Sequence, residues 1–331
     1  MFYKQSISLF FGSKMLIISE EDVEKQVSMR EAIEVVEKAF LEYARGSVKM
    51  PKRSTIMIEK FGGSISLMPS YLEESDALAI KIISIYPRNP ERGYPTTAAW
   101  IVVNNPETGM MEALIDATYL TALRTGAVTG VASRCLAPRN SKIAAVIGCG
   151  VQGEMQAWAM VEVFNLEKIN AFDISQKRME RFANELEEKL GIDIHLSADC
   201  QEAVENADII ATATTSKTPV IKRNWLSKDV HINAIGSFYP DHRELDSETI
   251  KDAKVVVDSR EAVLAEAGDL LIPIREGKIT KDHIYAELGE VLLGSKIGRT
   301  NDDKLTVFKS VGLAIQDSSV AKMVINKMKK N

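Results

Sequence analysis

One stretch, residues 144–153, constrains the fold of this chain more than any other. It reads Ala-Ala-Val-Ile-Gly-Cys-Gly-Val-Gln-Gly, so an apolar strand pattern runs directly into Gly-x-Gly-x-x-Gly and then into a helical pattern. In such a motif the first glycine permits a tight turn, the second lets the backbone approach a pyrophosphate, and the third lets the helix pack on the strand. The N-terminus of that helix favours anions. We therefore predict a dinucleotide-binding site that includes Gly148, Gly150, Val151 and Gln152.

A second apolar run, residues 169–172, supports this prediction. It leads into Asp173, about 20 residues beyond the last glycine, where this fold places a carboxylate against the ribose 2′-hydroxyl. A carboxylate there favours NAD(H), because it would repel the 2′-phosphate of NADP(H). Lys177 and Arg178 follow closely and would soften that preference, so NADP(H) stays open and Arg178 is included among the cofactor-binding residues. Alternatively, Asp173 only caps the helix expected at residues 176–190.

The length and composition of the chain narrow its class. With 331 residues it exceeds what one hydrophobic core usually serves, so we expect two domains. Hydrophobic residues make up 45% of the chain, yet no apolar run approaches the roughly 20 residues that a membrane span needs. The formal net charge of −5, without clustered Lys and Arg, argues against a nucleic-acid partner. We therefore expect a small-molecule substrate, with neither membrane nor nucleic acid as a partner.

The cysteines and histidines indicate neither disulfides nor a metal. The three cysteines are far apart, are odd in number and form no Cys-x-x-Cys pair, which fits a reducing compartment such as the cytoplasm. The four histidines show no i, i+4 pair or other ligand spacing, so core or surface positions are the simpler interpretation. We predict no metal site. The residues concerned are Cys135, Cys149, Cys200, His195, His231, His242 and His283.

The part of the chain before the glycine-rich stretch predicts a separate α+β domain. Residues 1–14 lack the cleaner pattern that begins at Met15 and are expected to be an extension, without the cleavage site of a signal peptide. Ser28 and Glu31 form a capping box at the start of a helix that ends at Gly46. Short runs that are bounded by glycines and by prolines such as Pro69 predict an antiparallel sheet, with strands at residues 54–58, 64–68, 77–85 and 98–103. A helix at residues 116–136 is expected to connect to the next domain.

The part after residue 153 predicts a doubly wound parallel sheet, because strand and helix patterns alternate there. In this fold ligands bind beyond the carboxyl ends of the strands, which selects Thr212, Thr214, Gly236 and Ser237 as cofactor-facing. Taken singly, each is equally well explained as an ordinary loop residue. A final strand and helix at residues 306–325 are expected to return to the first domain. The other expected strands are at residues 169–172, 194–196, 208–212, 231–235 and 255–258.

These segments, in this order, resemble the ornithine cyclodeaminase/mu-crystallin family over residues 15–325. The resemblance rests on the motifs AIKII (79–83), GYPT (93–96), ALRTGA (122–127), IGCGVQ (147–152), HINAIG (231–236), AELGE (286–290) and TVFKSVG (306–312). It implies a Rossmann-type NAD-binding domain at residues 128–306. It also implies an α+β domain for substrate binding and homodimer formation at residues 15–127 and 307–331, with the substrate in the cleft between the domains. Arg124, Thr125 and Ser310 would then join the cofactor-binding residues.

Lys81 interrupts an otherwise apolar strand, and a lone ammonium among buried neighbours has to be paired or functional. The alternative is that its side chain reaches the surface from a strand edge. The resemblance makes Lys81 catalytic, since a buried amine with a lowered pKa can hold a substrate carboxylate and exchange a proton with the substrate nitrogen. Arg124, on a helix of small residues, is expected to bind the same carboxylate. Arg53 matches an arginine of the mu-crystallin-like members, so the resemblance implies that it also binds the substrate carboxylate. Without this match, Arg53 would be interpreted as an ordinary surface charge.

Two positions depart from the cyclodeaminases and archaeal-type alanine dehydrogenases of this family. Those proteins carry an arginine where this chain has Ser66, and an aspartate where this chain has Phe238. Asp241, three residues further on, is not assumed to replace that acid. Hydrolytic deamination needs a base to activate water, whereas reduction of a preformed cyclic imine needs a carboxylate clamp, a proton donor and an apolar wall. The pattern therefore favours reduction.

The sequence leads to the hypothesis of an NAD(P)H-dependent ketimine reductase. Its expected substrate is Δ1-pyrroline-2-carboxylate or Δ1-piperideine-2-carboxylate, reduced to L-proline or L-pipecolate. Arg53, Lys81 and Arg124 would anchor the carboxylate, and Lys81 would supply the proton. Alanine dehydrogenase and ornithine cyclodeaminase are the alternatives among enzymes. A non-enzymatic binding protein is disfavoured, because Lys81 and the glycine-rich loop are both intact.

Overall fold

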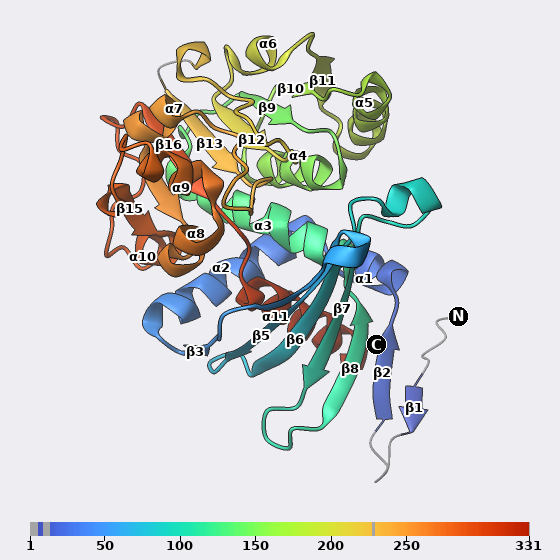
Figure 1. Cartoon of the computed structure of the whole chain (residues 1–331). Helices are drawn as coiled ribbons and strands as arrows, with labels where there is room; N and C mark the ends of the chain where they lie inside the picture. Colours follow the sequence, from blue (N-terminus) through green and yellow to red (C-terminus); the bar gives the residue numbers. More distant parts are fainter. Residues whose placement is uncertain (1–5, 9–13, 227–228, 331) are drawn as a thin grey trace. The chain divides into compact units, whose positions relative to one another are not determined.

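Two compact units make up the chain. The computed structural model describes residues 6–8, 14–226 and 229–330 (Figure 1). The first unit comprises residues 1–124 and 313–331, and the second comprises residues 125–312. The sequence places the second boundary at 306/307, which would cut the strand β16 (Leu305–Lys309), whereas this strand lies inside the second sheet. The assignment of one unit to the substrate and the other to the cofactor stays a prediction here.

The first unit is built on a mixed sheet. Its strands follow the order β1-β2-β8-β7-β6-β5-β3, and β4 pairs with β5. Every pair is antiparallel except β2 with β8. The strands predicted at residues 54–58 and 77–85 are confirmed as β4 and β6. The bounds are β1 Ser6–Ser8, β2 Lys14–Ile18, β3 Val48–Lys49, β4 Ser54–Ile58, β5 Gly63–Leu72, β6 Ala77–Ile85, β7 Thr97–Asn104 and β8 Met111–Asp116.

The prediction that Pro69 bounds a strand is wrong. β5 continues through Pro69, which pairs with Ile80 of β6. On the other side of β5, β3 ends at Lys49 and β4 begins at Ser54, so no described strand residue pairs with Pro69 there. A proline, which has no N–H to donate, is tolerated where it faces such a gap in the ladder.

The connecting helix begins later than predicted. Asp116 is the last residue of β8, and the helix α3 spans Thr118–Leu136. The Oδ1 of Asp116 accepts the Thr118 N–H at 3.3 Å, so Asp116 belongs to the turn before the helix. The strands β2, β3 and β8 have no counterpart in the sequence prediction, because periodicity alone does not identify short runs as strands.

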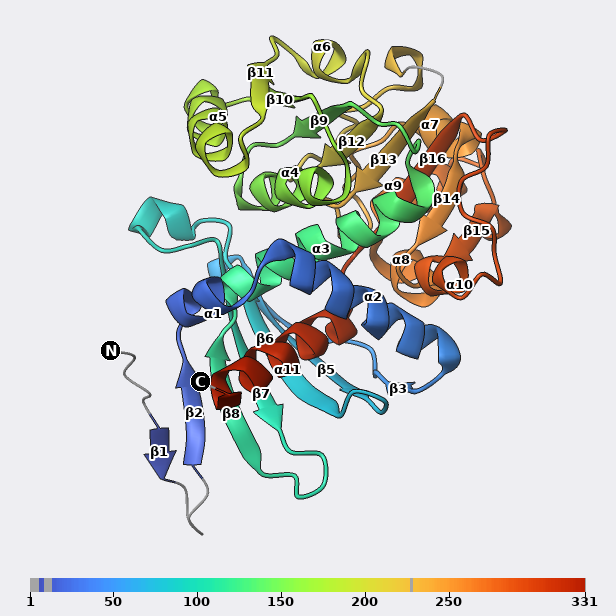
Figure 2. The same cartoon turned by 180° about the vertical axis from the view of Figure 1, so that it is seen from behind.

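Helices cover one face of the first sheet. Figure 2 shows α11 (Ala314–Lys330, red) lying along β5, β6 and β7, with α2 (Met29–Arg45) packed against it. The predicted capping box of α2 is confirmed, because the Ser28 hydroxyl accepts the Glu31 N–H and the Glu31 carboxylate accepts the Ser28 N–H. Gly46 ends this helix with a φ of 82°. The remaining helical segments of the unit are α1 Glu20–Gln26, η1 Glu59–Phe61 and η2 Asn89–Arg92.

The opposite face of this sheet is apolar and exposed. Leu67, Ile82 and Trp100 form one cross-strand row on β5, β6 and β7, and they are 40%, 37% and 42% exposed. Ile56 of β4 is 60% exposed. It lies two residues after Ser54, which pairs with Leu67, so Ile56 points to the same side. We call Ile56, Leu67, Ile82 and Trp100 the open face.

The second unit is a parallel sheet that is buried on both faces, as predicted. Its strand order is β11-β10-β9-β12-β13-β16-β14-β15, and every pair is parallel. Ala144 and Val146 of β9 belong to one apolar cluster, whereas Ala145 and Ile147 belong to the other, on the opposite side of the sheet. The bounds are β9 Ile143–Ile147, β10 Lys168–Phe172, β11 Asp193–Leu196, β12 Ile209–Thr212, β13 Val230–Ala234, β14 Lys254–Val257, β15 Ile284–Glu287 and β16 Leu305–Lys309.

Helices connect these strands, and the helix predicted at residues 176–190 is confirmed as α5. The helical segments are α4 Val151–Val163, α5 Gln176–Leu190, α6 Cys200–Val204, η3 Arg223–Trp225, α7 Ser247–Asp252, α8 Arg260–Glu266, α9 Gly268–Arg275, η4 Lys281–His283 and α10 Leu288–Leu292. The three cysteines, all within the described residues, form no disulfide. Across the described ranges, no helix is both long enough and apolar enough to cross a membrane.

Part of the predicted N-terminal extension joins the first sheet. β1 pairs antiparallel with β2, with Ser6 opposite Leu16. Residues 1–5 and 9–13 of that extension lie outside the described residues.

Phe182 on α5 tests the packing of the second unit. It is fully buried in the cluster that contains Ala144 and Val146. Phe182→Ala leaves a cavity, so we expect the free energy of unfolding in urea to fall by about 3–5 kcal/mol. Glu188→Ala, an exposed change on the same helix, is the control and should alter that energy by less than about 0.5 kcal/mol. A loss below about 1 kcal/mol for Phe182→Ala would contradict this packing.

Candidate active site

Lys81 lies in the middle of β6 and is buried. Its side chain is 1% exposed, and the strand register places it opposite Met68 of β5 and Ile101 of β7. The helix α11 packs over these three strands. The alternative that the Lys81 side chain reaches the surface is therefore wrong, and a buried ammonium in this place needs a partner.

Asp317 of α11 is that partner. Its Oδ2 lies 2.7 Å from the Nζ of Lys81, and its Oδ1 lies 2.9 Å from the Nε of Arg124. Arg124 also donates through Nη1 to the Oε1 of Gln316. All three members of the ion cluster are at most 7% exposed. One carboxylate therefore holds the ammonium of β6 and the guanidinium of α3 in fixed positions.

Asp317 and Gln316 are functional candidates that the sequence prediction missed. An acidic residue on an amphipathic helix usually lies in solvent. The signal that was available is that Asp317 is the single acidic residue in the sequence of α11. Its partner in β6 is distant in sequence, so the pairing becomes visible only in the fold.

The ion cluster carries an excess of positive charge. Burial, followed by the charge of Arg124, lowers the pKa of Lys81 to about 7, while Asp317 opposes this shift. Arg53 also lowers the pKa of Lys81, so its guanidinium lies within electrostatic range. Arg53 is half-buried, directly before β4. In the cluster of Lys81, Arg124 and Asp317, two cationic groups face one carboxylate, so the cluster could accept a further anionic group such as a substrate carboxylate.

Ser66 lies on the same side of the sheet as Lys81. It is two residues before Met68, the cross-strand partner of Lys81, and side chains alternate along a strand. The Ser66 hydroxyl is 2.8 Å from the hydroxyl oxygen of Thr55, with which it forms a hydrogen bond. The small, neutral side chain of Ser66 thus lies on the face of the sheet that carries Lys81. Cyclodeaminases are expected to have an arginine at this position.

The predicted cofactor segments meet at one edge of the second sheet. The last residues of seven strands form a continuous cross-strand row, which consists of Phe172, Ile147, Thr212, Ala234, Lys309, Val257 and Glu287. The strand order reverses between β9 and β12 in this row, and dinucleotides bind at such a point in doubly wound sheets. The segments that follow this edge contain Gly148, Asp173, Thr214, Gly236, Ser237 and Ser310.

The glycine-rich loop has a shape that fits a diphosphate. Gly148 has a φ of 101°, which glycine adopts readily, and a Cβ on Gly153 would lie 2.0 Å from the Gly148 carbonyl oxygen. A Cβ on Gly150 would meet no atom within 4 Å, so the space there is open. Gly150 is the N-cap of α4, and it has no side chain that could accept a hydrogen bond from the first N–H groups of this helix. The buried Oε1 of Gln152 has no hydrogen-bond partner within the described part of the chain. The loop therefore offers amide groups and room to a phosphate.

Asp173 closes this loop from the next strand. Its Oδ2 accepts the Cys149 N–H at 3.0 Å, and its Oδ1 accepts the Ser175 N–H at 2.9 Å. Ser175 is the N-cap of α5, so the alternative that Asp173 caps this helix is wrong. Arg178 is exposed, with its Nη1 3.9 Å from the Oδ2 of Asp173, and such a pair contributes little stability. Contact of Asp173 or Arg178 with a ribose stays a prediction.

The hydroxyl groups of Thr212 and Thr214, two residues predicted to face the cofactor, bind a protein carboxylate. Thr212 and Thr214 both donate from Oγ1 to Glu244, at 2.9 and 2.8 Å. Thr212 is fully buried, so it supports the loop from within the sheet. Glu244 was not predicted, because a glutamate between two elements usually reads as a surface charge.

Ser237 and Ser310 also have internal partners. The Ser237 hydroxyl donates to the carbonyl oxygen of His242 at 2.7 Å, and the Ser310 hydroxyl donates to the Oδ2 of Asp258 at 2.7 Å. Thr125 is buried on α3. The hydroxyl groups of Ser237 and Ser310 are therefore already engaged within the second unit.

Phe238 and Asp241 provide no buried acid near β13. Phe238 packs against the apolar core of the second unit, and its ring centroid is 4.7 Å from that of Tyr239. The Asp241 side chain is 73% exposed, with its Oδ1 3.8 Å from the Nε2 of His242. The structure therefore gives Asp241 no place in the buried network at this edge.

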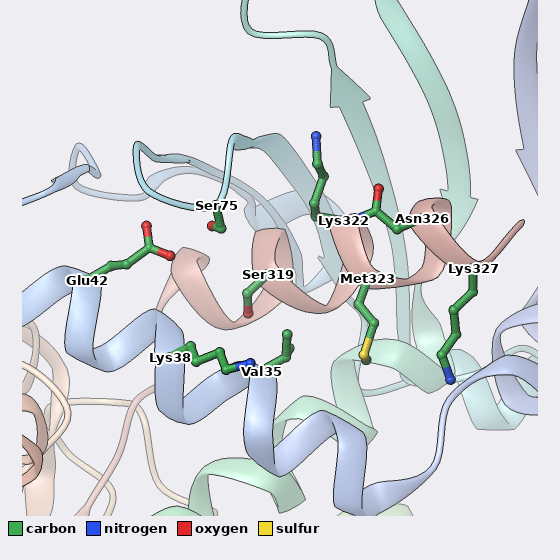
Figure 3. Close-up of a pocket in the computed structure, with 9 residues that line it drawn as sticks. All are labelled: Val35, Lys38, Glu42, Ser75, Ser319, Lys322, Met323, Asn326 and Lys327. Atoms are coloured by element: carbon green, nitrogen blue, oxygen red, sulfur yellow. The ribbon is translucent and has the colours of Figure 1, made fainter. Parts of the chain in front are cut away.

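A groove of about 350 Å³ lies between α2 and α11 in the first unit. Figure 3 shows the side chains that line it, which include Lys38, Lys322 and Lys327. The Nζ of Lys327 already donates to the carbonyl oxygen of Gln26 and to the carboxylate of Glu31. None of the predicted site residues lines this groove.

Metal ligands are not clustered in the part of the chain that the structure describes. His231 is a core residue of β13, whose ring nitrogens lie 2.9 Å from the Thr306 hydroxyl and 3.2 Å from the Asn233 side-chain oxygen. Burial lowers the pKa of His231 to about 3, so the ring is neutral at physiological pH.

Comparison with known proteins identifies the family. The profile of the ornithine cyclodeaminase/mu-crystallin family matches residues 13–331. A Δ1-pyrroline-2-carboxylate reductase of Bacillus cereus is 40% identical over 314 residues, which cover 95% of this chain and 96% of that protein. The structure of Thermococcus litoralis Δ1-pyrroline-2-carboxylate reductase in complex with NADH and L-proline is 49% identical, with a TM-score of 0.94 over 96% of this chain and 98% of that chain.

An archaeal alanine dehydrogenase dimer with bound NAD is 38% identical to this chain. Its TM-score is 0.90, and the match covers 96% of each chain. On the profile match and these identities, the chain belongs to the ornithine cyclodeaminase/mu-crystallin family.

Proposed function

We propose that this protein is an NAD(P)H-dependent ketimine reductase that converts Δ1-pyrroline-2-carboxylate or Δ1-piperideine-2-carboxylate into L-proline or L-pipecolate. The observation that carries the proposal is the buried cluster of Lys81, Asp317 and Arg124. The cluster contains an amine with a pKa of about 7, and its surplus positive charge would bind the substrate carboxylate. The Bacillus cereus and Thermococcus litoralis relatives are named as reductases of Δ1-pyrroline-2-carboxylate, which supports this substrate class.

The second unit would hold the cofactor. The open space at Gly150 suits the diphosphate, and Asp173 suits the adenosine ribose of NAD(H), while Arg178 is the group that would admit NADP(H). When bound, the reduced nicotinamide supplies the hydride that the C=N carbon accepts. The remaining residues proposed for this site are Arg124, Thr125, Gly148, Val151, Gln152, Thr214, Gly236, Ser237 and Ser310, with Thr212 supporting them. The NADH complex of the Thermococcus litoralis reductase supports this choice of cofactor.

Lys81 is the proposed proton donor. Conversion of the imine into an amine adds one proton to nitrogen and one hydride to the neighbouring carbon. Because the pKa of Lys81 is about 7, both of its forms are populated at neutral pH, so it can release a proton and regain one. Asp317 holds the ammonium in place, and Arg124 and Arg53 would bind the substrate carboxylate. That carboxylate adds negative charge and so favours protonated Lys81 until the transfer.

Reduction explains the residues better than hydrolytic deamination does. Deamination needs an acid–base group that activates water. Ser66 and Phe238 stand where the sequence comparison expects an arginine and an aspartate in cyclodeaminases, and Asp241 is mostly exposed. Alanine dehydrogenase activity is the second candidate, favoured by the 38% identity to an archaeal alanine dehydrogenase.

A substrate panel tests this function. We expect the purified protein to oxidise NADH rapidly with either cyclic imine and at least about tenfold more slowly with pyruvate plus ammonia, because a preformed ring places nitrogen, carbon and carboxylate together. With ornithine we expect no release of ammonia. Faster turnover of pyruvate plus ammonia, or ammonia release from ornithine, would refute the assignment.

Replacement of Lys81 tests the proton donor. Lys81→Ala should abolish imine reduction while NADH binding, followed by fluorescence, stays within about twofold of the parent. Ser70→Ala changes a neutral contact between β5 and α11, a hydrogen bond to Ser318 at 2.7 Å, and is the matched control that should keep activity. If Lys81→Ala reduces the imine as fast as the parent protein, Lys81 is not the proton donor.

Asp317→Asn tests the ion cluster through pH. The change removes the negative charge that raises the pKa of Lys81, so this pKa should fall below about 7. The protonated form is the donor, and kcat/KM of the parent should therefore decline as the pH rises through about 7. In the variant that decline should move to lower pH by about one unit or more, in addition to a lower rate. An unchanged pH profile would show that Asp317 does not set the charge of Lys81.

We also propose that the protein is a cytoplasmic homodimer. The open face supports the dimer, because four large apolar side chains on a sheet are exposed without a covering helix. An archaeal alanine dehydrogenase relative is described as a dimer, which supports the proposed dimeric state. The cysteines, none of which forms a disulfide in the described structure, fit a reducing compartment.

Trp100→Lys places a charge in the open face. Burying that ammonium between two copies would be costly, so we expect the variant to sediment as a monomer at concentrations at which the parent is a dimer. Glu107→Lys, an exposed change in the turn between β7 and β8, is the control and should leave the dimer intact. A folded Trp100→Lys variant that remains dimeric would exclude the open face as the interface.

A further inference from the structure

Glu244 lies at the centre of a buried hydrogen-bond network in the second unit. It is fully buried, although it stands between elements. Its Oε1 accepts the Thr214 N–H at 2.7 Å and the Thr214 hydroxyl at 2.8 Å. Its Oε2 accepts the Thr212 hydroxyl at 2.9 Å, the Gly236 N–H at 2.8 Å and the Ser237 N–H at 3.3 Å. One carboxylate therefore joins the loop after β12 to the loop after β13.

A second carboxylate and a lysine hold Glu244 itself. The Oδ1 of Asp269 accepts the N–H groups of Glu244 and Leu245, at 2.7 and 2.9 Å. The Nζ of Lys309 lies 2.9 Å from the Oδ2 of Asp269 and donates to the carbonyl oxygen of Ser237 at 2.6 Å. Burial raises the pKa of Glu244, whereas the charge of Lys309 opposes this shift. The three ionisable groups are thus supplied with partners while they are completely buried.

The network requires a carboxylate rather than an amide at position 244. Backbone N–H groups can only donate, so the oxygen that faces Thr214 and the oxygen that faces Gly236 both have to accept. An amide would turn an NH2 group toward one of these donors. A Cβ on Gly236 would lie 2.3 Å from the backbone N of Thr214, so the two loops have little room to rearrange.

We propose that Glu244 is a positioning residue that shapes the nicotinamide end of the cofactor site before the cofactor binds. This rests on the proposed function. Asp173 sets the adenosine half on the β10 side of the glycine loop, so the nicotinamide half extends over the loops after β12 and β13. Glu244 acts through Thr214, Gly236 and Ser237, whose backbone it fixes in the free protein. The ordering of these loops then costs little at binding.

Glu244→Gln tests this proposal by NADH titration. We expect the Kd and the KM for NADH to rise at least about tenfold, with a smaller change in kcat, because the loops must be ordered by the cofactor. Glu244→Asp retains both acceptor oxygens and should recover part of the affinity. A folded Glu244→Gln variant whose Kd stays within about threefold of the parent would overturn the proposal.

Asp208→Asn is the matched control for a merely structural effect. The Oδ2 of Asp208 accepts the N–H groups of Lys142 and Ile143, at 2.7 and 3.0 Å, at the opposite edge of the same sheet. This variant should lower the melting temperature but leave the Kd for NADH within about twofold. An equal loss of NADH affinity in both variants would also overturn the proposal.

Hydrogen exchange in the parent protein decides the matter if Glu244→Gln does not fold. The amides of Thr214, Gly236 and Ser237 should be protected without NADH, and added NADH should change their exchange little. Rapid exchange that slows only after NADH is added would overturn the proposal. A parent protein that binds no NADH would refute the proposed function instead, since the exchange measurement reports the network independently.

Discussion

The carboxylate of Asp317 allows the first unit to bury two cations in its core. Without it, Lys81 and Arg124 would repel each other in a place where water does not reach them, and the cost of such burial is several kcal/mol per ion. One carboxylate cannot fully balance two cations, and the charge of Arg53 also acts on Lys81. Burial, followed by the positive charge of Arg124, lowers the pKa of Lys81, and the surplus positive charge would attract an anion. The surplus of positive charge thus contributes to the lowered pKa of the amine and suits the carboxylate of the proposed substrate.

In the second unit, too, buried charged groups hold the proposed site residues in place. The segments proposed to face the cofactor are held by buried side chains, since Glu244 fixes the loops after β12 and β13 and Asp258 fixes the segment after β16. The glycine loop supplies open space and main-chain amides. In both units, buried charged or hydroxyl groups hold the groups that would meet small molecules. Because these supporting groups all have partners, the proposed site residues are rigid.

The sequence predicted most of the parallel sheet, the glycine loop and Lys81, because each leaves a local signal: alternating elements, spaced glycines, and a charge inside an apolar strand. Asp317 and Glu244 leave none, since acidic residues on a helix or between elements usually lie in solvent and their partners are distant in sequence. The path of β5 through Pro69 depended on a gap between β3 and β4, which only the pairing reveals. The place of β16 between β13 and β14 was likewise invisible, because sheet order need not follow chain order.

The helix α11 is the last element of the chain, yet it packs on β5, β6 and β7, which are synthesised much earlier. A chain emerging from the ribosome therefore carries Lys81 for most of its synthesis without the carboxylate that will neutralise it. The second unit is continuous in sequence, from residue 125 to residue 312, so all its contacts exist before α11 is made. Domains tend to fold as units during synthesis. The nascent protein would accordingly mature from its middle outward, and its chemistry would begin only when the final turns close over the first sheet.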